Sequence, residues 1–445
     1  MKFGGTSLAN AERIKNVAEI VKTKLDKSPL VVVSAVSGIT NKLLDLAKNS
    51  AKKVEPSEKF NEIKEIHEQI IENLGLNKNL LEKDLEKLYD TMKGIYLLEE
   101  TSLRTLDLVA SFGEIFSSKI LSEYLNLIQI KSKQYCGWEI GIITDDNFTN
   151  AEILQETYKN IKSNLSNLDS IPIITGFIAK NKKNEITTLG RGGSDYTASI
   201  IGAGLKVDEI EIWTDVSGIK TADPRIVKDA KQWEKVTFNE ASEMAYFGAK
   251  VLHPKTIKPA VDNEIPVRVL NTYEPENPGT LIVKEDPEEC VFRAVSSKDN
   301  LTVLKIASTK MFLAHGFLAN VFNILDKHKI SVDLVSTSEV TVSFTLDNIN
   351  GSFENLESAL TELKKFSTVE ILKQRAIICI VGKDIPGKTG ILGKIFNICK
   401  NYKIDVELVS QGASPISISF VVKQEEAPLI IRELHRGLFE ENDNI

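Results

Sequence analysis

Residues 329–336 read KISVDLVS, and residues 403–410 read KIDVELVS. The helical segments before them also correspond, because VFNI at 321–324 recurs as IFNI at 395–398. Both pairs are offset by 74 residues (403 minus 329 and 395 minus 321). Each copy runs strand, helix, strand, strand, helix, which is typical of a ferredoxin-like βαββαβ unit with helices on one face of an antiparallel sheet. Two copies are too few for a solenoid, so we expect two modules that pack side by side.

The chain before this repeat alternates between strand and helix patterns. Residues 30–33 (LVVV), 171–178 (IPIITGFI) and 210–214 (IEIWT) are β-rich runs, as expected of buried strands. Helical spacing relates Ile14, Val17, Ala18, Val21 and Leu25. This alternation predicts an α/β fold, with a mainly parallel sheet sandwiched by helices. Residues 56–125 are helical and strongly charged, and they would form a lid, a dimer surface or plain helical packing.

These patterns define the expected domains. We predict an α/β domain at residues 1–285, a first βαββαβ module at residues 300–370, and a second module built from residues 286–299 and 371–445. In the first module we expect strands at 301–307, 331–337 and 341–346 and helices at 316–328 and 354–363.

Composition and charge exclude several classes of protein. The 445 residues are 42% hydrophobic and 26% charged, which is typical of a globular chain of several domains. No run reaches the roughly 18 apolar residues of a membrane span, and the first residues do not resemble a secretory signal. A net charge of −7 argues against nucleic acid or an anionic membrane as partner. The cysteines form no C-x-x-C pair and the histidines are scattered, so we expect no disulfide, no metal site and a cytoplasmic location.

Two glycine-rich segments carry candidate chemistry. Residues 2–7 read KFGGTS: the glycines let the backbone approach a phosphate, and Lys2 adds a positive charge. The spacing is not that of a P-loop, and a plain Gly-Gly turn would also explain it. Residues 187–195 read TTLGRGGSD, where Arg191 can bind a carboxylate through two hydrogen bonds. We expect Ser194 or Asp195 to cap a helix at residues 198–205; a tight turn with a capped helix would explain these two residues but not the arginine.

Two later segments offer further cations. Residues 213–225 read WTDVSGIKTADPR, in which a strand ends at an Asp, and ligands of parallel sheets gather at the carboxyl ends of strands. Residues 247–254 read FGAKVLHP and place Lys250 at the end of a helix, where it would also simply favour the negative helix end. Lys2, Lys250 and Arg225 converging on a triphosphate would form a phosphoryl-transfer site.

Taken together, these segments resemble the aspartate kinases in order and spacing. The resemblance also includes SAVSGITN at residues 34–41 and Glu114, and it covers essentially the whole chain. It implies the amino-acid kinase fold for the α/β domain, and the repeat resembles paired ACT domains. The chain is most similar to the single-function, lysine-sensitive branch, and because it ends soon after the repeat we expect no fused homoserine dehydrogenase.

The resemblance implies ATP- and Mg²⁺-dependent phosphorylation of the side-chain carboxylate of L-aspartate, giving 4-phospho-L-aspartate on the route to lysine, threonine and methionine. Lys2 would stabilise the transferring phosphoryl group, Arg191 would hold the α-carboxylate and Glu114 the α-amino group. Asp195 would complete the catalytic pair with Lys2. The remaining substrate contacts would be Ser34, Thr40 and Ser194, and the nucleotide contacts Gly4, Gly5, Thr6, Thr214, Asp215, Lys220, Arg225, Lys250 and Val251.

The resemblance also implies feedback inhibition by L-lysine and a homodimer or dimer of dimers that forms through the ACT domains. We expect lysine to bind at the junction of the repeats, across a dimer of regulatory domains; the alternative is that both repeats only hold the dimer together. A lysine effector needs an anion for its ε-ammonium, and Asp333 or Glu339 would supply it. Its carboxylate would meet backbone N–H groups at the helix start near Gly316, and its stem an apolar lining. The expected effector residues are Met311, Ala314, Phe317, Leu318, Asp333, Ser338, Glu339 and Val340.

Two alternative functions remain open at this stage. One is an amino-acid kinase of the same fold that acts on another carboxylate, such as glutamate or acetylglutamate. The other is a non-catalytic amino-acid sensor whose kinase-like part only binds nucleotide. A substrate panel distinguishes the first, and aspartate-dependent ATP turnover distinguishes the second.

Overall fold

The computed structural model divides into two compact units. It describes residues 1–166, 168–247, 252–286, 291–308, 315–347, 353–383, 385, 389–411 and 414–440. The first unit comprises Met1–Ile219, Gln232–Phe238 and Val251–Asp286, and the second comprises Lys220–Lys231, Asn239–Lys250 and Pro287–Ile445. Segments 220–231 and 239–250, which lie within the α/β domain predicted at 1–285, thus make most of their contacts with the C-terminal unit.

An eight-stranded sheet forms the centre of the first unit, in the order β3-β5-β2-β1-β8-β10-β11-β9. Among these strands, each neighbouring pair is parallel except β10 and β11. The strands are β1 (Lys2–Phe3), β2 (Val31–Val33), β3 (Ser132–Tyr135), β5 (Ile171–Thr175), β8 (Ile210–Thr214), β9 (Lys235–Thr237), β10 (Val267–Asn271) and β11 (Thr280–Val283). The predicted mainly parallel sheet is confirmed. Its central strands are apolar because helices cover both faces.

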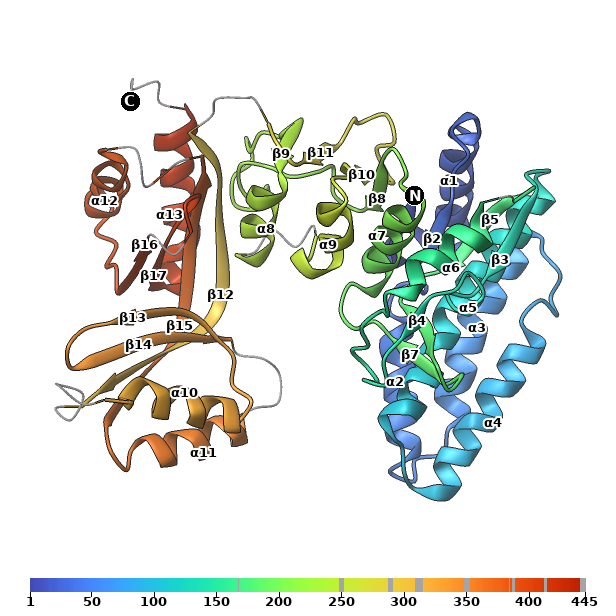
Figure 1. Cartoon of the computed structure of the whole chain (residues 1–445), viewed down its shortest axis with the longest axis horizontal. Coiled ribbons are helices and arrows are strands. Elements are labelled where there is room, and N and C mark those ends of the chain that lie inside the picture. The colour runs from blue at the N-terminus through green and yellow to red at the C-terminus, as the bar shows by residue number, and fades with distance from the viewer. Residues whose placement is uncertain are drawn as a thin grey trace. The chain divides into compact units, whose positions relative to one another are not determined.

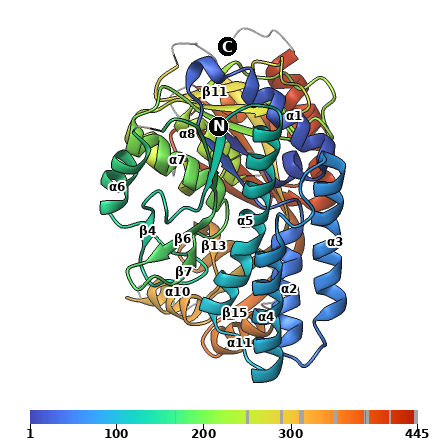
Figure 2. The same cartoon turned by 90° about the vertical axis from the view of Figure 1, so that its right-hand side faces the viewer.

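Five helices of the N-terminal half pack into one core with this sheet. They are α1 (Ala11–Lys22), α2 (Ile39–Ser50), α3 (Ser57–Leu74), α4 (Glu82–Leu98) and α5 (Leu103–Leu127). Figure 2 shows α2, α3, α4 and α5 running side by side. Buried residues such as Ile63, Leu88 and Phe116 join the same cluster as Phe3 and Val33. The charged insertion at 56–125 therefore packs as ordinary amphipathic helices, whatever further role its outer surface has.

Three sequence expectations for this unit need correction. Leu25 lies beyond the end of α1, in a short 3₁₀ turn, and is 43% exposed. The run 171–178 is interrupted by a turn at Phe177, which has a left-handed φ of 65°. Neither Ser194 nor Asp195 caps a helix, because α7 (Gly193–Leu205) already begins at Gly193 after the left-handed Gly192.

The first unit contains further elements besides the main sheet. They are the small sheet of β4 (Ile143–Thr144), β6 (Ile178–Asn181) and β7 (Ile186–Thr188), the helices α6 (Glu156–Leu165) and α9 (Pro254–Asp262), and the start of α8 (Phe238–Tyr246), most of which belongs to the second unit. Among them, α6 and α9 pack against α7.

A six-stranded antiparallel sheet forms the second unit, in the order β13-β14-β12-β15-β17-β16. Its elements are β12 (Phe292–Ala307), α10 (Phe317–Lys327), β13 (Val332–Thr337), β14 (Thr341–Asp347), α11 (Phe353–Leu363), β15 (Thr368–Gly382), α12 (Ile391–Asn401), β16 (Leu408–Gln411), β17 (Ser417–Lys423) and α13 (Ala427–His435). The predicted repeat is confirmed, since α10 and α12 have the same length and lie 74 residues apart.

Two long strands join the copies into one sheet. The first half of β12 pairs with the second half of β15, and the second half of β12 with the first half of β15. Figure 1 shows β12 and β15 extending through both halves of this sheet. One core lies under α10 and α11 around Val321 and Phe344, and another under α12 and α13 around Ile395 and Phe420. Each βαββαβ unit therefore keeps its own core although the sheet is shared. In the parts of the chain that the structure describes, no helix is long and apolar enough to cross a bilayer.

Candidate active site

A cavity of about 560 Å³ lies at the carboxyl ends of β1, β2, β5 and β8. This is the end of a parallel sheet at which ligands usually bind. The cavity is lined by Lys2, Gly4, Gly5, Thr6, Ser34, Ala35, Val36, Ser37, Gly38, Thr40, Asn41, Glu114, Phe177, Gly190, Arg191, Gly192, Gly193, Ser194, Asp195, Thr214 and Asp215. The structure thus brings together predicted residues from five separate segments of the chain.

The Gly4-Gly5 segment allows two loops to approach each other closely. A Cβ on Gly5 would lie 2.7 Å from the carbonyl oxygen of Ala35, so no side chain fits there. The N–H of Ser37 donates to the Gly5 carbonyl at 3.1 Å, and the N–H of Gly4 donates to the Trp213 carbonyl at 3.2 Å. The glycines therefore bring the loops after β1, β2 and β8 around one space.

Lys2 and Asp195 form an ion pair at the bottom of this space. Lys2 Nζ lies 2.7 Å from Asp195 Oδ1, and both side chains are largely buried. Asp195 thus neutralises and orients the ammonium, whose N–H groups remain available to a phosphate oxygen.

Glu114 presents a buried acceptor to the cavity. It lies on α5, is 3% exposed and accepts a hydrogen bond at Oε1 from the N–H of Ala35 (3.2 Å). Its Oε2 is buried without a hydrogen-bond partner in the described protein. Burial raises the pKa of Glu114 to about 8. A cationic ligand group next to Oε2 would satisfy this oxygen and restore the charged form.

Arg191 offers the complementary charge. Its side chain is exposed at the cavity, and no ion pair or hydrogen bond holds its guanidinium within the described residues. The flanking Gly190 and Gly192 both have left-handed φ angles, of 75° and 70°. The loop therefore projects an unpaired guanidinium toward the same cavity that contains the Glu114 carboxylate.

The structure also adds cavity residues that the sequence reasoning did not single out. Asn41 and Ser37 also line the cavity, but of segment 34–41 the sequence predicts only Ser34 and Thr40 as substrate contacts. Phe177 follows β5 directly, and its left-handed backbone is uncommon for an aromatic residue. Its position after Gly176, at the end of a buried strand, is the sequence feature that could have indicated a cavity residue.

The predicted nucleotide contacts are only partly assembled in this cavity. Thr214 and Asp215 line it, and Thr214 Oγ1 donates to Asp215 Oδ1 at 3.1 Å. Lys220 and Arg225 belong to the second unit, where Arg225 makes a two-pronged ion pair with Asp223. Lys250 and Val251 lie outside the described residues. The roles of these four residues stay predictions.

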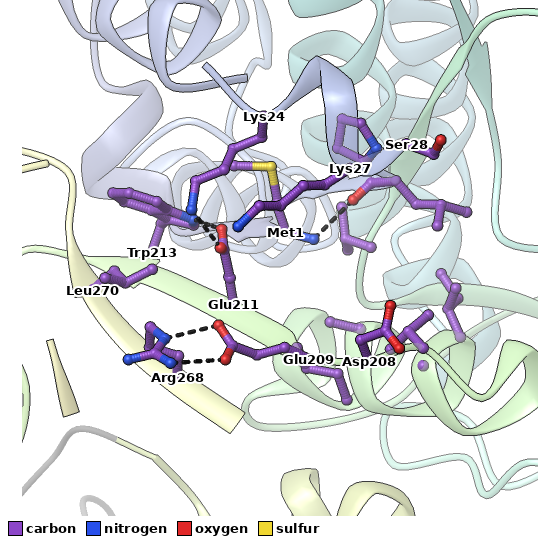
Figure 3. Close-up of a pocket in the computed structure, with 18 of the residues that line it drawn as sticks. Met1, Lys24, Lys27, Ser28, Asp208, Glu209, Glu211, Trp213, Arg268 and Leu270 are labelled. Carbon is purple, nitrogen blue, oxygen red and sulfur yellow. Dashed lines mark hydrogen bonds and ion pairs between the residues drawn. The ribbon is translucent and has the colours of Figure 1, made fainter. Parts of the chain in front are cut away.

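A second, larger cavity of about 880 Å³ lies at the opposite, amino ends of β1, β2 and β8 (Figure 3). There Lys24 Nζ contacts Glu211 at 2.8 Å, and Arg268 forms a two-pronged pair with Glu209. Figure 3 shows both pairs as direct contacts, with dashed lines from Lys24 to Glu211 and from Arg268 to Glu209. The partners in these two ion pairs satisfy each other's charges. In the smaller cavity, Arg191 and Glu114 Oε2 have no hydrogen-bond or ion-pair partner in the described residues, so we place the chemistry there.

The predicted effector residues lie around β13 and the start of α10. Asp333 is not a free anion: its Oδ1 accepts from Tyr246 Oη (2.6 Å), and its Oδ2 lies 2.6 Å from Lys298 Nζ. Lys298 also contacts Asp347 and lies over the ring of Tyr246. Ser338, Glu339 and Val340 form an exposed turn between β13 and β14.

At the start of α10 the two predicted lining residues differ. Phe317 is buried in the module core, whereas Leu318 is 37% exposed. Met311 and Ala314 lie outside the described residues. Of these two predicted apolar contacts, Leu318 therefore has the more accessible side chain.

Metal binding through protein side chains alone finds no support in the described residues, which contain no group of three or more metal-ligating side chains. A magnesium ion that accompanies a nucleotide needs fewer protein side chains as ligands, because phosphate oxygens and water supply most of its coordination. Asp195 and Asp215 provide carboxylate oxygens in the cavity, so the donor set fits that mode of binding.

Comparison with known proteins agrees with this arrangement. The profile of the amino acid kinase family matches residues 1–271, and an ACT domain profile matches residues 378–438. Aspartokinase 2, chloroplastic, of Arabidopsis thaliana is 42% identical over 99% of this chain and 84% of its own length. Lysine-sensitive aspartokinase 3 of Escherichia coli K12 is 37% identical, over 99% of this chain and 98% of its own.

Solved structures extend the similarity to the fold. Escherichia coli aspartokinase III in complex with aspartate and ADP (R-state) aligns with a TM-score of 0.83 at 35% identity, covering 99% of both chains. The same enzyme in complex with lysine and aspartate (T-state) aligns with a TM-score of 0.83 at 36% identity and the same coverage. From the matched family profile, these full-length relatives and the shared fold, the chain belongs to the amino acid kinase family and, within it, to the aspartokinases.

Proposed function

We propose that this protein transfers the γ-phosphoryl group of ATP to the side-chain carboxylate of L-aspartate, giving 4-phospho-L-aspartate and ADP. One observation carries the substrate assignment: Glu114 Oε2, which is buried, and the Arg191 guanidinium share one cavity, and neither has a hydrogen-bond partner among the residues that the structure describes. Together they match the α-ammonium and α-carboxylate of an amino acid. The relative solved with aspartate and ADP supports the same assignment.

The chemistry requires charge stabilisation rather than a general base. A side-chain carboxylate with a pKa near 3.9 is already ionised at neutral pH and is itself the nucleophile. Its attack on the γ-phosphorus brings two anions together, and the ammonium of Lys2 offsets this repulsion. Asp195 keeps the Lys2 ammonium in position through the ion pair.

We propose Mg²⁺ as the accompanying ion. Asp215, with Asp195 as the second carboxylate of the cavity, would hold it together with the phosphates. When bound, the ion would supply positive charge to the phosphoryl oxygens. Lys220, Arg225, Lys250 and Val251 remain our proposed additional nucleotide contacts.

The decisive experiment is ADP release that depends on aspartate, combined with capture of the acyl phosphate by hydroxylamine. We expect turnover with L-aspartate and little with L-glutamate, N-acetylglutamate or L-asparagine. Arg191→Ala should raise the KM for aspartate at least tenfold and change the KM for ATP little, because it removes a carboxylate contact. Preference for another carboxylate would reassign the substrate, and nucleotide binding without turnover would favour a sensor.

We further propose that L-lysine inhibits the enzyme through the first βαββαβ module. The relative solved with lysine supports this effector. Because Asp333 is engaged by Lys298 and Tyr246, Glu339 is the better candidate anion for the ε-ammonium. Backbone N–H groups at the start of α10 would meet the carboxylate, and the exposed Leu318 and Val340 would contact the stem.

We propose self-association through the same modules, as a homodimer or a dimer of dimers. β13 and β16 are the edge strands of the six-stranded sheet. Val335 and Val409, which occupy equivalent positions in the two copies, are each 39% exposed there. Exposed apolar side chains on the edge strands of a sheet favour association. Light scattering at micromolar concentration tests the proposal, and a monomeric mass would contradict it.

A further inference from the structure

Asp107 is a buried carboxylate on α5 that the proposed chemistry does not use. It is 1% exposed, and no ion pair is found for it in the described residues. Its Oδ2 accepts hydrogen bonds from the N–H groups of Thr149 (2.9 Å) and Thr188 (3.0 Å), and its Oδ1 accepts one from Thr188 Oγ1 (2.8 Å). Burying a carboxyl group is unfavourable unless its acceptors are satisfied, and here three donors from two loops satisfy them.

One of the two donor residues, Thr188, lies immediately before the loop that carries Arg191. Thr188 is the last residue of β7, and the loop 189–193 follows it. Thr149 belongs to the neighbouring loop and has a left-handed φ of 71°. The N–H of Ala151 donates to the Thr188 carbonyl (2.9 Å), and a Cβ on Gly190 would lie 2.5 Å from Asn150 Oδ1. The two loops therefore pack directly on each other, and Asp107 anchors both to α5.

The same helix holds the other side of the cavity. Glu114, seven residues and about two turns further along α5, accepts from the N–H of Ala35. Ser117 Oγ donates to the Ser34 carbonyl at 2.7 Å. One helix thus contacts the loop after β2 through Glu114 and Ser117, and the Arg191 loop through Asp107.

We propose that Asp107 is a positioning residue that sets the separation between the Arg191 guanidinium and the Glu114 carboxylate, and so the recognition of the two ends of the amino-acid substrate. This inference rests on the proposed aspartate site. Arg191 lies between two left-handed glycines, and its side chain makes no hydrogen bond or ion pair with the described residues, so its placement depends on how the loop is anchored. The three hydrogen bonds of Asp107 supply that anchor next to the first glycine.

The test is Asp107→Asn, which keeps the size of the side chain but replaces one of the two acceptor oxygens with a donor NH2 and removes the charge that strengthens the three hydrogen bonds. We expect the KM for aspartate to rise at least tenfold, while the KM for ATP and the affinity for ADP stay within twofold. Thr188→Val removes only the hydroxyl bond and should have a smaller effect, and the double variant should be little worse than Asp107→Asn alone.

Asp145→Asn is the matched control. Asp145 Oδ1 accepts from the N–H groups of Asn147 and Glu152 in the neighbouring loop, but it makes no bond to α5. The Asp145→Asn variant should have a KM for aspartate within twofold of that of the wild type. A parallel rise of both KM values in Asp107→Asn, or an equal effect of Asp145→Asn, would mean that Asp107 serves only the fold and would overturn the proposal.

Hydrogen exchange separates this inference from the proposed function. The amides of Thr149 and Thr188 should exchange faster in Asp107→Asn without any substrate present. Unchanged exchange at both amides would overturn the anchoring role even if the kinase is active. If the wild-type protein shows no aspartate-dependent turnover, the proposed function is overturned, and with it the positioning role of Asp107. The exchange data would still decide whether Asp107 anchors the two loops.

Discussion

Lys2 is only 8% exposed, yet its ammonium faces a cavity and is balanced by a single carboxylate, that of Asp195. A buried lysine with one partner is well placed to stabilise charge that is redistributed during phosphoryl transfer. We therefore expect Lys2→Ala to lower kcat about a hundredfold, roughly 3 kcal/mol, with a much smaller change in the KM for aspartate.

Steady-state kinetics under saturating ATP check this prediction. Lys24→Ala is the control, because Lys24 pairs with Glu211 in the other cavity. Its kcat should stay within about twofold of the wild type, as expected of a residue outside the site. A Lys2→Ala variant with near wild-type kcat would remove Lys2 from the mechanism.

Glu114 makes the site sensitive to pH. Burial raises its pKa from 4.5 to about 8, so the folded protein without substrate binds a proton that the unfolded chain releases. The free energy of unfolding should therefore decrease as pH rises from about 4.5 to about 8. Binding of an α-ammonium requires the ionised form, so kcat/KM for aspartate should increase with pH up to about 8.

Glu114→Gln provides the comparison, since it is close in size and does not titrate. Both pH dependences should flatten in this variant over the range from 4.5 to 8, and the KM for aspartate should rise at every pH. Denaturant unfolding and initial rates measured across this range test the prediction. Unchanged profiles in Glu114→Gln would mean that another group titrates.

At the scale of elements, α5 organises the first unit and α3 packs against it. His67 of α3 is fully buried, its ring lies edge-on to Phe116 of α5, and its Nδ1 is 2.7 Å from the Ile63 carbonyl. Desolvation lowers the pKa of His67 from 6.5 to about 4. The unfolded chain therefore binds a proton between these values that the folded protein does not bind, and stability is lost as pH falls from about 6.5 to about 4.

We expect His67→Gln to reduce this acid-linked loss of stability, because glutamine can still donate to the Ile63 carbonyl but does not titrate. The measurement is the free energy of unfolding at several pH values between 4 and 7. His315→Gln, at an exposed position of the second unit, should leave the slope unchanged. Equal slopes in wild type and His67→Gln would contradict a buried neutral histidine.

At the scale of the whole molecule, regulation depends on whether Asp333 binds the effector or links elements of the second unit. Asp333 connects β13 to Tyr246 of α8 and to Lys298 of β12. We expect Glu339→Gln to raise the lysine concentration for half-inhibition about tenfold without changing the uninhibited kcat or the melting temperature, because an exposed anion for the effector is lost.

Asp333→Asn should instead lower the melting temperature of the second unit, since Lys298 and Tyr246 lose a shared acceptor, and it should change lysine affinity less. Calorimetric titration with L-lysine and thermal unfolding distinguish the two residues. If Asp333→Asn weakens lysine binding more than Glu339→Gln does, Asp333 is the residue that binds the ε-ammonium of the effector. No lysine binding at millimolar concentration would end the regulatory proposal without affecting the kinase assignment.

The sequence by itself was sufficient to predict the α/β fold, the internal repeat and most of the segments that line the cavity. Alternating apolar runs and a 74-residue repeat are local patterns, and glycines beside Lys2 and Arg191 signal close backbone approaches wherever they occur in the chain. That these segments meet at one sheet edge also follows from the parallel arrangement, which gathers the carboxyl ends of strands together.

The tertiary structure alone decided the contacts between distant residues. Asp107 and Thr188 are 81 residues apart, and Asp333 and Tyr246 are 87 apart, so no local pattern relates them. Only the tertiary structure shows that segments 220–231 and 239–250 belong to the second unit. It also shows that Asp333 contacts Lys298 and Tyr246 of that unit. A carboxylate looks the same in sequence whether it binds a ligand, an ion pair or backbone amides, because only the packed chain determines which donors surround it.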